Sequence, residues 1–168
     1  MRHLVLLIAL AGCNDPGRET AVHELGTLEY ELPVGWQAQE QVSHGRRIVV
    51  WSPTNNPRNE TITLVRSEPL PALAKAGASA VSHHLASAQL ALAGRFSPAT
   101  TFTSKHGFAG ARTIGSFTPP GRRGAYARAH AVVVDGDSLL HVLYTSEHAG
   151  SSIDSFENLL DSLQRKGA

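Results

Sequence analysis

An Asp-Gly dipeptide between two alternating segments limits the folds open to this chain more than any other feature. Segment 124–134, "GAYARAHAVVV", precedes Asp135-Gly136, and segment 137–147, "DSLLHVLYTSE", begins directly after it. Asp-Gly in this setting favours a two-residue hairpin turn, because a type I′ turn needs positive φ at both central residues. The sequence therefore predicts an antiparallel hairpin in the C-terminal half of the chain.

Four other segments have the composition of strands. In residues 28–32, apolar and acidic residues alternate, and the turn Pro33-Val34-Gly35-Trp36 ends the segment. Segments 46–52, "RRIVVWS", and 60–67, "ETITLVRS", are rich in β-branched residues and are separated by the turn-forming "PTNNPRN". These two segments predict a second hairpin, and 110–117 predicts a further strand.

Two segments have helical periodicity. Residues 70–93 are rich in alanine and have an apolar stripe at three- and four-residue steps, closed by Gly94. Residues 151–167 have a second stripe, with Ser151 and Asp154 spaced as a capping box and Arg165-Lys166 at the negative end of the helix dipole. The stripes consist of Ala74, Ala78, Val81, Leu85, Ala88 and Leu92 in the first helix and of Ile153, Phe156, Leu160 and Leu163 in the second. The whole pattern predicts an α+β fold, an antiparallel β-sheet flanked by helices.

The chain opens with a short apolar run that is typical of an export signal. The positive head Met1-Arg2-His3 precedes the apolar residues 4–11, and polar residues follow from Asn14 onward. A membrane-spanning helix needs about 20 apolar residues, so this run is too short to cross a bilayer. We therefore expect secretion, with no helical membrane anchor at this end.

The residues that end this run resemble the lipobox of bacterial lipoproteins. In this resemblance, Leu10, Ala11 and Gly12 correspond to the recognition site for signal peptidase, and Cys13 is the only cysteine of the chain. The resemblance implies a covalent lipid on Cys13, added before cleavage leaves this cysteine as the first residue, and no other cofactor. Two or three acyl chains hold a soluble domain durably at a membrane. The alternative is a free thiol, buried or removed with the leader. In the lipoprotein class that this run resembles, the residue after the cysteine influences sorting, and Asn14 at that position implies the outer membrane of a Gram-negative envelope rather than the inner, with the domain facing the periplasm.

These features divide the chain into three parts: residues 1–12 as signal peptide, 13–26 as the lipidated cysteine and a flexible tether, and 27–168 as a single domain. Lys and Arg number 15, so loss of Arg2 leaves 14 basic against 14 acidic residues. Such a balance gives no electrostatic basis for binding nucleic acid. With its one cysteine lipidated the chain forms no internal disulfide, and packing alone must hold the domain together.

The order of the predicted elements resembles the PsbP/Mog1/DcrB-like superfamily over residues 27–165. The turn Pro33-Val34-Gly35-Trp36 is similar to that family's early proline-glycine-tryptophan turn, and the ending Phe156-x-x-Leu159-Leu160-x-Ser162-Leu163 is similar to its closing helix. The resemblance implies an α/β/α sandwich around an antiparallel sheet. It also implies binding rather than catalysis, because members of this superfamily mostly bind other proteins and share no catalytic motif.

The nine histidines suggest a metal site, and the most specific candidate ligands are a pair in the C-terminal hairpin. With Asp135-Gly136 in the turn, His130 lies opposite His141 on one face of the sheet. Zinc needs three or four ligands, and no further ligand is evident beside the two. The alternative is a pair packed under a helix or facing solvent. The adjacent His83-His84 point about 100° apart on a helix and cannot chelate together.

The chain lacks the usual signatures of enzymes. It contains no Gly-x-Ser-x-Gly, no phosphate-binding loop and no dinucleotide fingerprint. The segment "PPGRRG", with Arg122 and Arg123, and the nearby Arg128 are candidates for a basic docking loop, although such a cluster is more often simply solvated.

The sequence thus favours a non-enzymatic lipoprotein that binds another envelope protein and assists the assembly or maintenance of an envelope complex. The alternative is a small-ligand or metal-binding lipoprotein that uses the face around His130 and His141. A hydrolase is a third hypothesis, which would need serine, histidine and aspartate to converge in a pocket.

Overall fold

The computed structural model describes residues 19–55, 59–90 and 94–167. In chain order the elements are β1 (Thr20–Leu25), β2 (Leu28–Pro33), β3 (Trp36–Ser43), β4 (Arg46–Pro53), β5 (Glu60–Arg66), α1 (Pro71–Leu90), β6 (Gly94–Phe96), β7 (Thr100–Thr103), β8 (Ala109–Phe117), β9 (Tyr126–Asp135), β10 (Ser138–Ser146), α2 (Asp154–Ser162) and β11 (Gln164–Arg165). Within this described part, no helix is long and apolar enough to span a bilayer. The leader and Cys13 lie outside the described residues.

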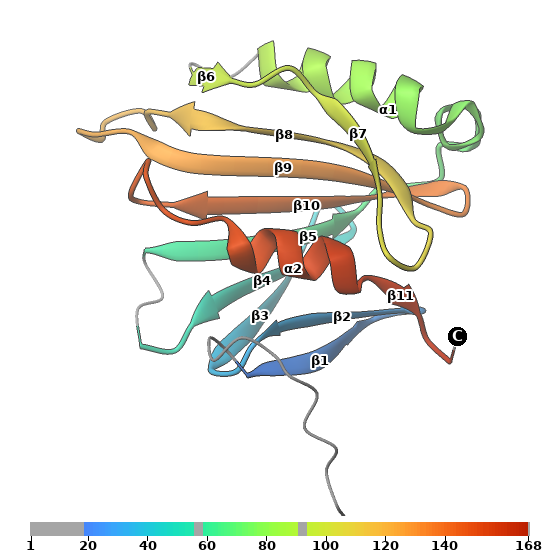
Figure 1. The fold of residues 1–168 in the computed structure, drawn as a ribbon, viewed down its shortest axis with the longest axis horizontal. Coiled ribbons are helices and arrows are strands. Elements are labelled where there is room, and N and C mark those ends of the chain that lie inside the picture. Colours follow the sequence, from blue (N-terminus) through green and yellow to red (C-terminus); the bar gives the residue numbers. More distant parts are fainter. Residues whose placement is uncertain (1–18, 56–58, 91–93, 168) are drawn as a thin grey trace, which may run out of the picture.

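The strands form two antiparallel sheets (Figure 1). The large sheet has the order β3-β4-β5-β10-β9-β8-β6, and β7 also pairs with β8. The small sheet has the order β1-β2-β11. The predicted α+β class, with an antiparallel sheet and flanking helices, is confirmed, and so is the hairpin of β4 and β5.

One face of the large sheet is buried beneath α2 and the small sheet. Side chains from these layers form the larger of two apolar clusters, which includes Leu32, Ile62, Leu64, Val142, Tyr144, Phe156, Leu159 and Leu160. The indole Nε1 of Trp51 donates a hydrogen bond of 2.9 Å to the Tyr30 hydroxyl, which links the two sheets inside the core. The predicted apolar stripe of α2 therefore packs as expected, since Phe156, Leu160 and Leu163 are all buried.

The opposite face carries α1, which packs mainly on β8 and β9. Val81 and Leu85 of the helix meet Ala111, Val132 and Leu139 of the sheet in a smaller apolar cluster. The helix begins at Pro71, where the missing N–H costs nothing. It is interrupted at Gly77, whose φ of 79° and ψ of −171° are not helical, so the expected continuous helix is kinked. Gly94 starts β6 rather than capping the helix.

The turn between β9 and β10 differs from the prediction. Asp135 pairs with Ser138, so Gly136 and Asp137 form the turn. Among these turn residues only Gly136 has positive φ, at 67°, and a type I′ turn would need two. The buried carboxylate of Asp135 forms ion pairs with two arginines, which hold this residue inside the strand.

Of the strands that local sequence does not predict, β1 and β3 are the longest. The tether expected over residues 13–26 was wrong in its second half, because residues 20–25 are β1, paired along its length with β2. The polar β3 was also missed and pairs with β4. In both cases a neighbouring strand supplies the hydrogen bonds, so pairing prevails over a weak local pattern. The domain therefore begins near Thr20 rather than at residue 27.

The predicted ends of the C-terminal helix were also wrong. Ile153 occupies the N-cap position, and the Ser151 hydroxyl instead bonds that of Ser146 at 2.7 Å. Arg165 and Lys166 lie beyond the helix, where β11 has already joined the small sheet. Because both residues find acidic partners elsewhere, neither is needed at the helix dipole.

Candidate functional site

The candidate site is the part of the large sheet that α1 leaves uncovered. α1 packs on β7, β8, β9 and the near edge of β10, and thus lies at one end of the sheet (Figure 1). Beyond it, the same sheet face continues over β10, β5 and β4. We call this surface the open face, and it consists of Ile48, Val50, Thr61, Thr63, Val65, Leu143 and Thr145.

The open face is uncharged and half-buried. Alternation along each strand places these seven side chains on the α1 side, because Val65 is paired with both Ile48 and His141, and Thr63 with both Val50 and Leu143. All seven are β-branched or leucine, and each is neither fully buried nor fully exposed. Groups of this kind provide contact area and hydroxyl hydrogen bonds, but no acid, base or charged nucleophile.

The two predicted histidines lie at the border between α1 and the open face. His130 is paired with Leu143 and His141 with Val132, so the expected direct opposition of the histidines was wrong by two residues. A shift of two keeps both side chains on the same face. The structure brings them together on a diagonal, with His130 Nε2 3.2 Å from His141 Nδ1. The ring of His84, from α1, lies 6.3 Å from that of His141.

Burial controls the charge of this pair. It lowers the pKa of His130 to about 3 and that of His141 to about 4, and the neighbouring histidines lower both values further. Both imidazoles are therefore neutral at neutral pH. Within the described ranges, no group of three or more His, Cys, Asp or Glu side chains is arranged to hold a metal ion. The pair supplies two ligands at most.

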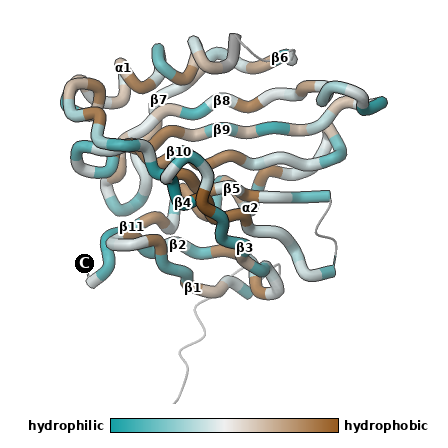
Figure 2. Tube along the Cα trace, turned by 180° about the vertical axis from the view of Figure 1, so that it is seen from behind, coloured by the Kyte–Doolittle hydropathy of each residue, from teal (hydrophilic) through white to brown (hydrophobic). Residues whose placement is uncertain are grey.

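The three arginines proposed for partner binding have different surroundings. Arg122 and Arg123 are exposed in the β8–β9 loop, where Figure 2 shows a hydrophilic hairpin end. Arg128 lies inside β9, and its guanidinium stands 5.3 Å from the Phe117 ring centroid. Burial lowers the pKa of Arg128, and its Nε is buried without a hydrogen-bond partner among the described residues. Of the three, only Arg122 and Arg123 present their charges fully to solvent.

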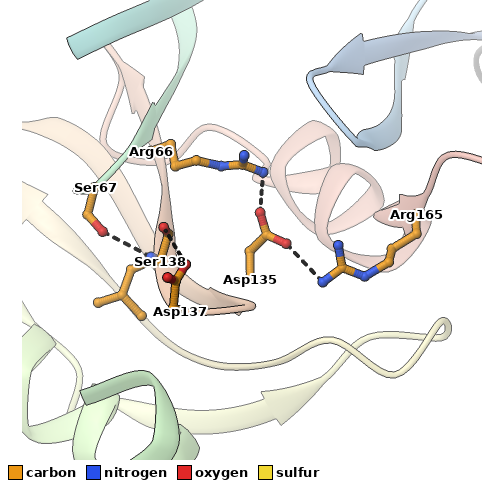
Figure 3. Close-up of polar contacts among 7 residues, drawn as sticks. Arg66, Ser67, Asp135, Asp137, Ser138 and Arg165 are labelled. Atoms are coloured by element: carbon orange, nitrogen blue, oxygen red, sulfur yellow. Dashed lines mark hydrogen bonds and ion pairs between the residues drawn. The ribbon is translucent and has the colours of Figure 1, made fainter. Parts of the chain in front are cut away.

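A buried ion-pair network, which sequence reasoning missed, lies at the other end of β9. The Asp135 side chain is 4% exposed and forms ion pairs with Arg66 and, at 3.1 Å, with Arg165 (Figure 3). Nearby, Ser67 Oγ accepts a hydrogen bond of 3.0 Å from the Leu139 N–H. The network joins β5, β9 and β11. No local pattern reveals it, because its three charged members are distant in the chain.

Comparison with known proteins identifies the fold. No family model and no curated protein matches the sequence. The solution structure of cyanobacterial PsbP (CyanoP) from Synechocystis is similar, with a TM-score of 0.62, 15% identity, and coverage of 94% of this chain and 99% of that one. LpqN of Mycobacterium tuberculosis, described as involved in cell envelope biogenesis, gives a TM-score of 0.60 and 14% identity over 87% and 90% of the two chains.

A crystal structure from Bacteroides thetaiotaomicron is also similar, with a TM-score of 0.56 and 12% identity over 83% of this chain. This chain spans only 45% of that protein. At such identities the similarities establish the fold, and the expected PsbP-like architecture is thereby confirmed.

Proposed function

We propose that this protein is a non-enzymatic, lipid-tethered domain of the bacterial cell envelope that binds another protein through the open face. The observation that carries the proposal is the uneven cover of the large sheet. One face is sealed by α2 and the small sheet, whereas the other has an uncharged, half-buried surface over β4, β5 and β10. A surface of this kind, with few charges at its centre, is typical of the core of a protein interface.

The envelope location rests on the first residues of the chain. Leu10, Ala11, Gly12 and Cys13 match a lipobox after a short apolar run, and a lipid on Cys13 would hold the domain at the membrane. We place the protein at the periplasmic side of the outer membrane. The description of LpqN, which has a similar fold, supports an envelope role. Mass spectrometry of the native product tests this part, since an uncut leader with a bare thiol would refute it.

The absence of catalysis is proposed from the chemistry around the histidine pair. The described neighbour of His130 across the β8–β9 ladder is Thr113, a hydroxyl residue. Its Oγ1 donates a hydrogen bond of 2.7 Å to the Ser97 carbonyl, so this hydroxyl is not arranged as a nucleophile. A nucleophile must instead donate its proton to an adjacent base. We therefore assign the histidines to the border of a binding surface.

Affinity capture from solubilised envelopes tests the binding surface. We compare wild type with Thr63→Lys, which places a charge in the middle of the open face. The matched control is Ile114→Lys, which adds the same charge at an exposed β-branched position on the other side of β8. We expect wild type and control to recover the same specific protein and Thr63→Lys to lose it. Equal recovery by all three, or no specific protein with wild type, would refute the proposed surface.

A second candidate function is binding of a metal or small ligand at His130 and His141. It is favoured by the contact of 3.2 Å between the two ring nitrogens. Elemental analysis of gently purified protein, repeated with His141→Ala, separates the two functions. Stoichiometric metal that disappears in the variant would support ligand binding, and equal metal content in both proteins would exclude this pair as a metal site.

A further inference from the structure

The edge strand β3 is unusually accessible. Seven of its residues are exposed, and only Trp36 is partly buried. Its described pairing is with β4 alone, and it forms one border of the large sheet. β3 therefore presents a row of backbone donors and acceptors that a further strand can use.

The hairpin geometry identifies which backbone groups of β3 point outward. His44 and Gly45 form a two-residue turn and both have positive φ, 50° and 74°. In such a hairpin the flanking pair, Ser43 and Arg46, exchanges hydrogen bonds, and bonded pairs then recur at every second residue. The odd-numbered residues of β3 thus bond β4, and the even-numbered ones direct their N–H and C=O groups outward. Pro53, which has no N–H, falls in a non-bonded pair, as this assignment requires.

The strand lacks the features by which edge strands usually avoid pairing. Residues 36–43 contain no proline, glycine or lysine, and their register with β4 runs without a bulge. The single charge in the strand, Glu40, is already paired with Arg47 of β4, whose Nε donates a hydrogen bond of 2.9 Å. Within the strand itself, neither its backbone geometry nor an unbalanced charge opposes pairing with another strand.

The side chains of β3 are compatible with pairing of this strand with β3 of a second copy of the chain. In an antiparallel pair about a twofold axis at Gln39, each Gln39 faces its counterpart, and Gln37 faces Gln41 of the second copy. On the other side of the sheet, Ala38 faces Glu40, and Trp36 faces Val42. A register centred on Glu40 is poorer because it opposes the two Glu40 side chains, and a register centred on Ala38 is poorer because it has fewer bonded pairs.

We propose that β3 pairs with β3 of a second copy of this chain, antiparallel and centred on Gln39. The outward groups of the even-numbered residues then form four bonded pairs, each exchanging two hydrogen bonds, eight in all. The contact is isologous, so it closes as a dimer. Because the axis is perpendicular to the sheet, the two open faces lie on the same side and form one continuous platform.

Cysteine cross-linking tests both the contact and its register. In the proposed pair the two Gln39 positions are a non-bonded pair, whose Cβ atoms lie about 5 Å apart and suit a disulfide. The two Gln41 positions lie four residues apart along the strands in this register, a distance of about 13 Å. The full chain is treated with a mild oxidant in mild detergent. Wild type is the control that measures cross-linking through Cys13 alone. Gln39→Cys should give a covalent dimer and Gln41→Cys should not.

Charge complementation gives an independent test. Like charges directly opposed across a strand pair are destabilising, so Gln39→Lys alone and Gln39→Glu alone should each weaken dimerisation about fivefold in analytical ultracentrifugation. An equimolar mixture of the two should restore it. Val22→Lys, which adds the charge to an edge strand of the small sheet, β1, should leave it unchanged.

Each outcome decides the proposal. A monomeric wild type at all concentrations, equal cross-linking at Gln39→Cys and Gln41→Cys, or no rescue in the mixture would overturn it. The inference is independent of the proposed envelope partner: loss of that partner in Thr63→Lys leaves the dimer intact, and a monomeric protein can still bind its partner through the open face.

Discussion

The two faces of the large sheet are built from the same strands but have different surroundings. Toward α2, β9 presents Ala127, Ala129, Ala131 and Val133, all buried in the larger apolar cluster. Toward α1, the same strand presents Arg128 and His130 beside the open face. One face is therefore committed to holding the domain together, whereas the other keeps polar and partly exposed groups. The contrast shows where the chain can tolerate change and where binding has room to evolve.

The largest loss of stability is expected from a cavity on the sealed face. Phe156 is completely buried between α2 and the sheet, so Phe156→Ala should reduce the free energy of unfolding by about 4 kcal/mol. Val65→Ala, on the open face, should reduce it by about 1 kcal/mol or less, because the side chain is already partly solvated. Urea titration measures both. Equal losses would contradict the difference in cover between the two faces.

Acid should weaken the domain through the histidine pair. Burial lowers the pKa of His130 to about 3 and of His141 to about 4, below the ordinary value of 6.5 that the unfolded chain regains. Below pH 6.5 the two histidines bind protons in the unfolded chain but not in the folded chain. The free energy of unfolding therefore falls as the pH falls, and the contribution of the neutral pair is fully present above that pH.

From pH 7 to pH 5 the two histidines together should remove about 3 kcal/mol from the free energy of unfolding. The control is the double variant His130→Gln, His141→Gln, which has no group titrating in this range at either position. Urea titrations at the two pH values should give a smaller loss for the variant than for wild type. Identical losses would mean that the pair is not buried as described.

The next largest loss of stability is expected when the ion-pair network at Asp135 is broken. Asp135→Ala removes the shared carboxylate and leaves the buried Nε of Arg66 in a site without a counter-charge. We expect a loss of about 2 kcal/mol, below the usual cost of breaking a buried pair because both arginines are partly exposed. Glu24→Ala, which removes the exposed partner of Lys166, should cost much less, because water and salt screen an exposed ion pair. Thermal denaturation at one pH compares the two, and similar shifts would contradict the buried role of Asp135.

The smallest effect should be that of a charge on the open face itself. Thr63→Lys should change the free energy of unfolding by about 0.5 kcal/mol, because the lysine stem can extend along the surface and keep its ammonium in water. This small loss is what makes the variant suitable for the binding test. A loss of several kcal/mol would show that another part of the chain covers the open face.

Particular residues show which parts of this arrangement were predictable. The strand segments 46–52 and 60–67 were found from β-branched composition, and the stripe of Phe156, Leu160 and Leu163 from helical spacing. The proximity of His130 and His141 followed from hairpin pairing even though the register was two residues off, because a shift of two preserves the face. The polar strands β1 and β3 were not predicted, since neither has an apolar pattern of its own.

The sequence by itself determined the class of fold, because alternation along a strand and the 3.6-residue period of a helix are local properties that each segment carries alone. It also determined that packing without a disulfide holds the described domain. Only the tertiary structure decided that Asp135 belongs to a strand, that β1 is part of the domain and that α1 leaves the open face uncovered. These features depend on contacts between residues far apart in the chain, such as Arg66 and Arg165 with Asp135, whose free energies no single segment contains.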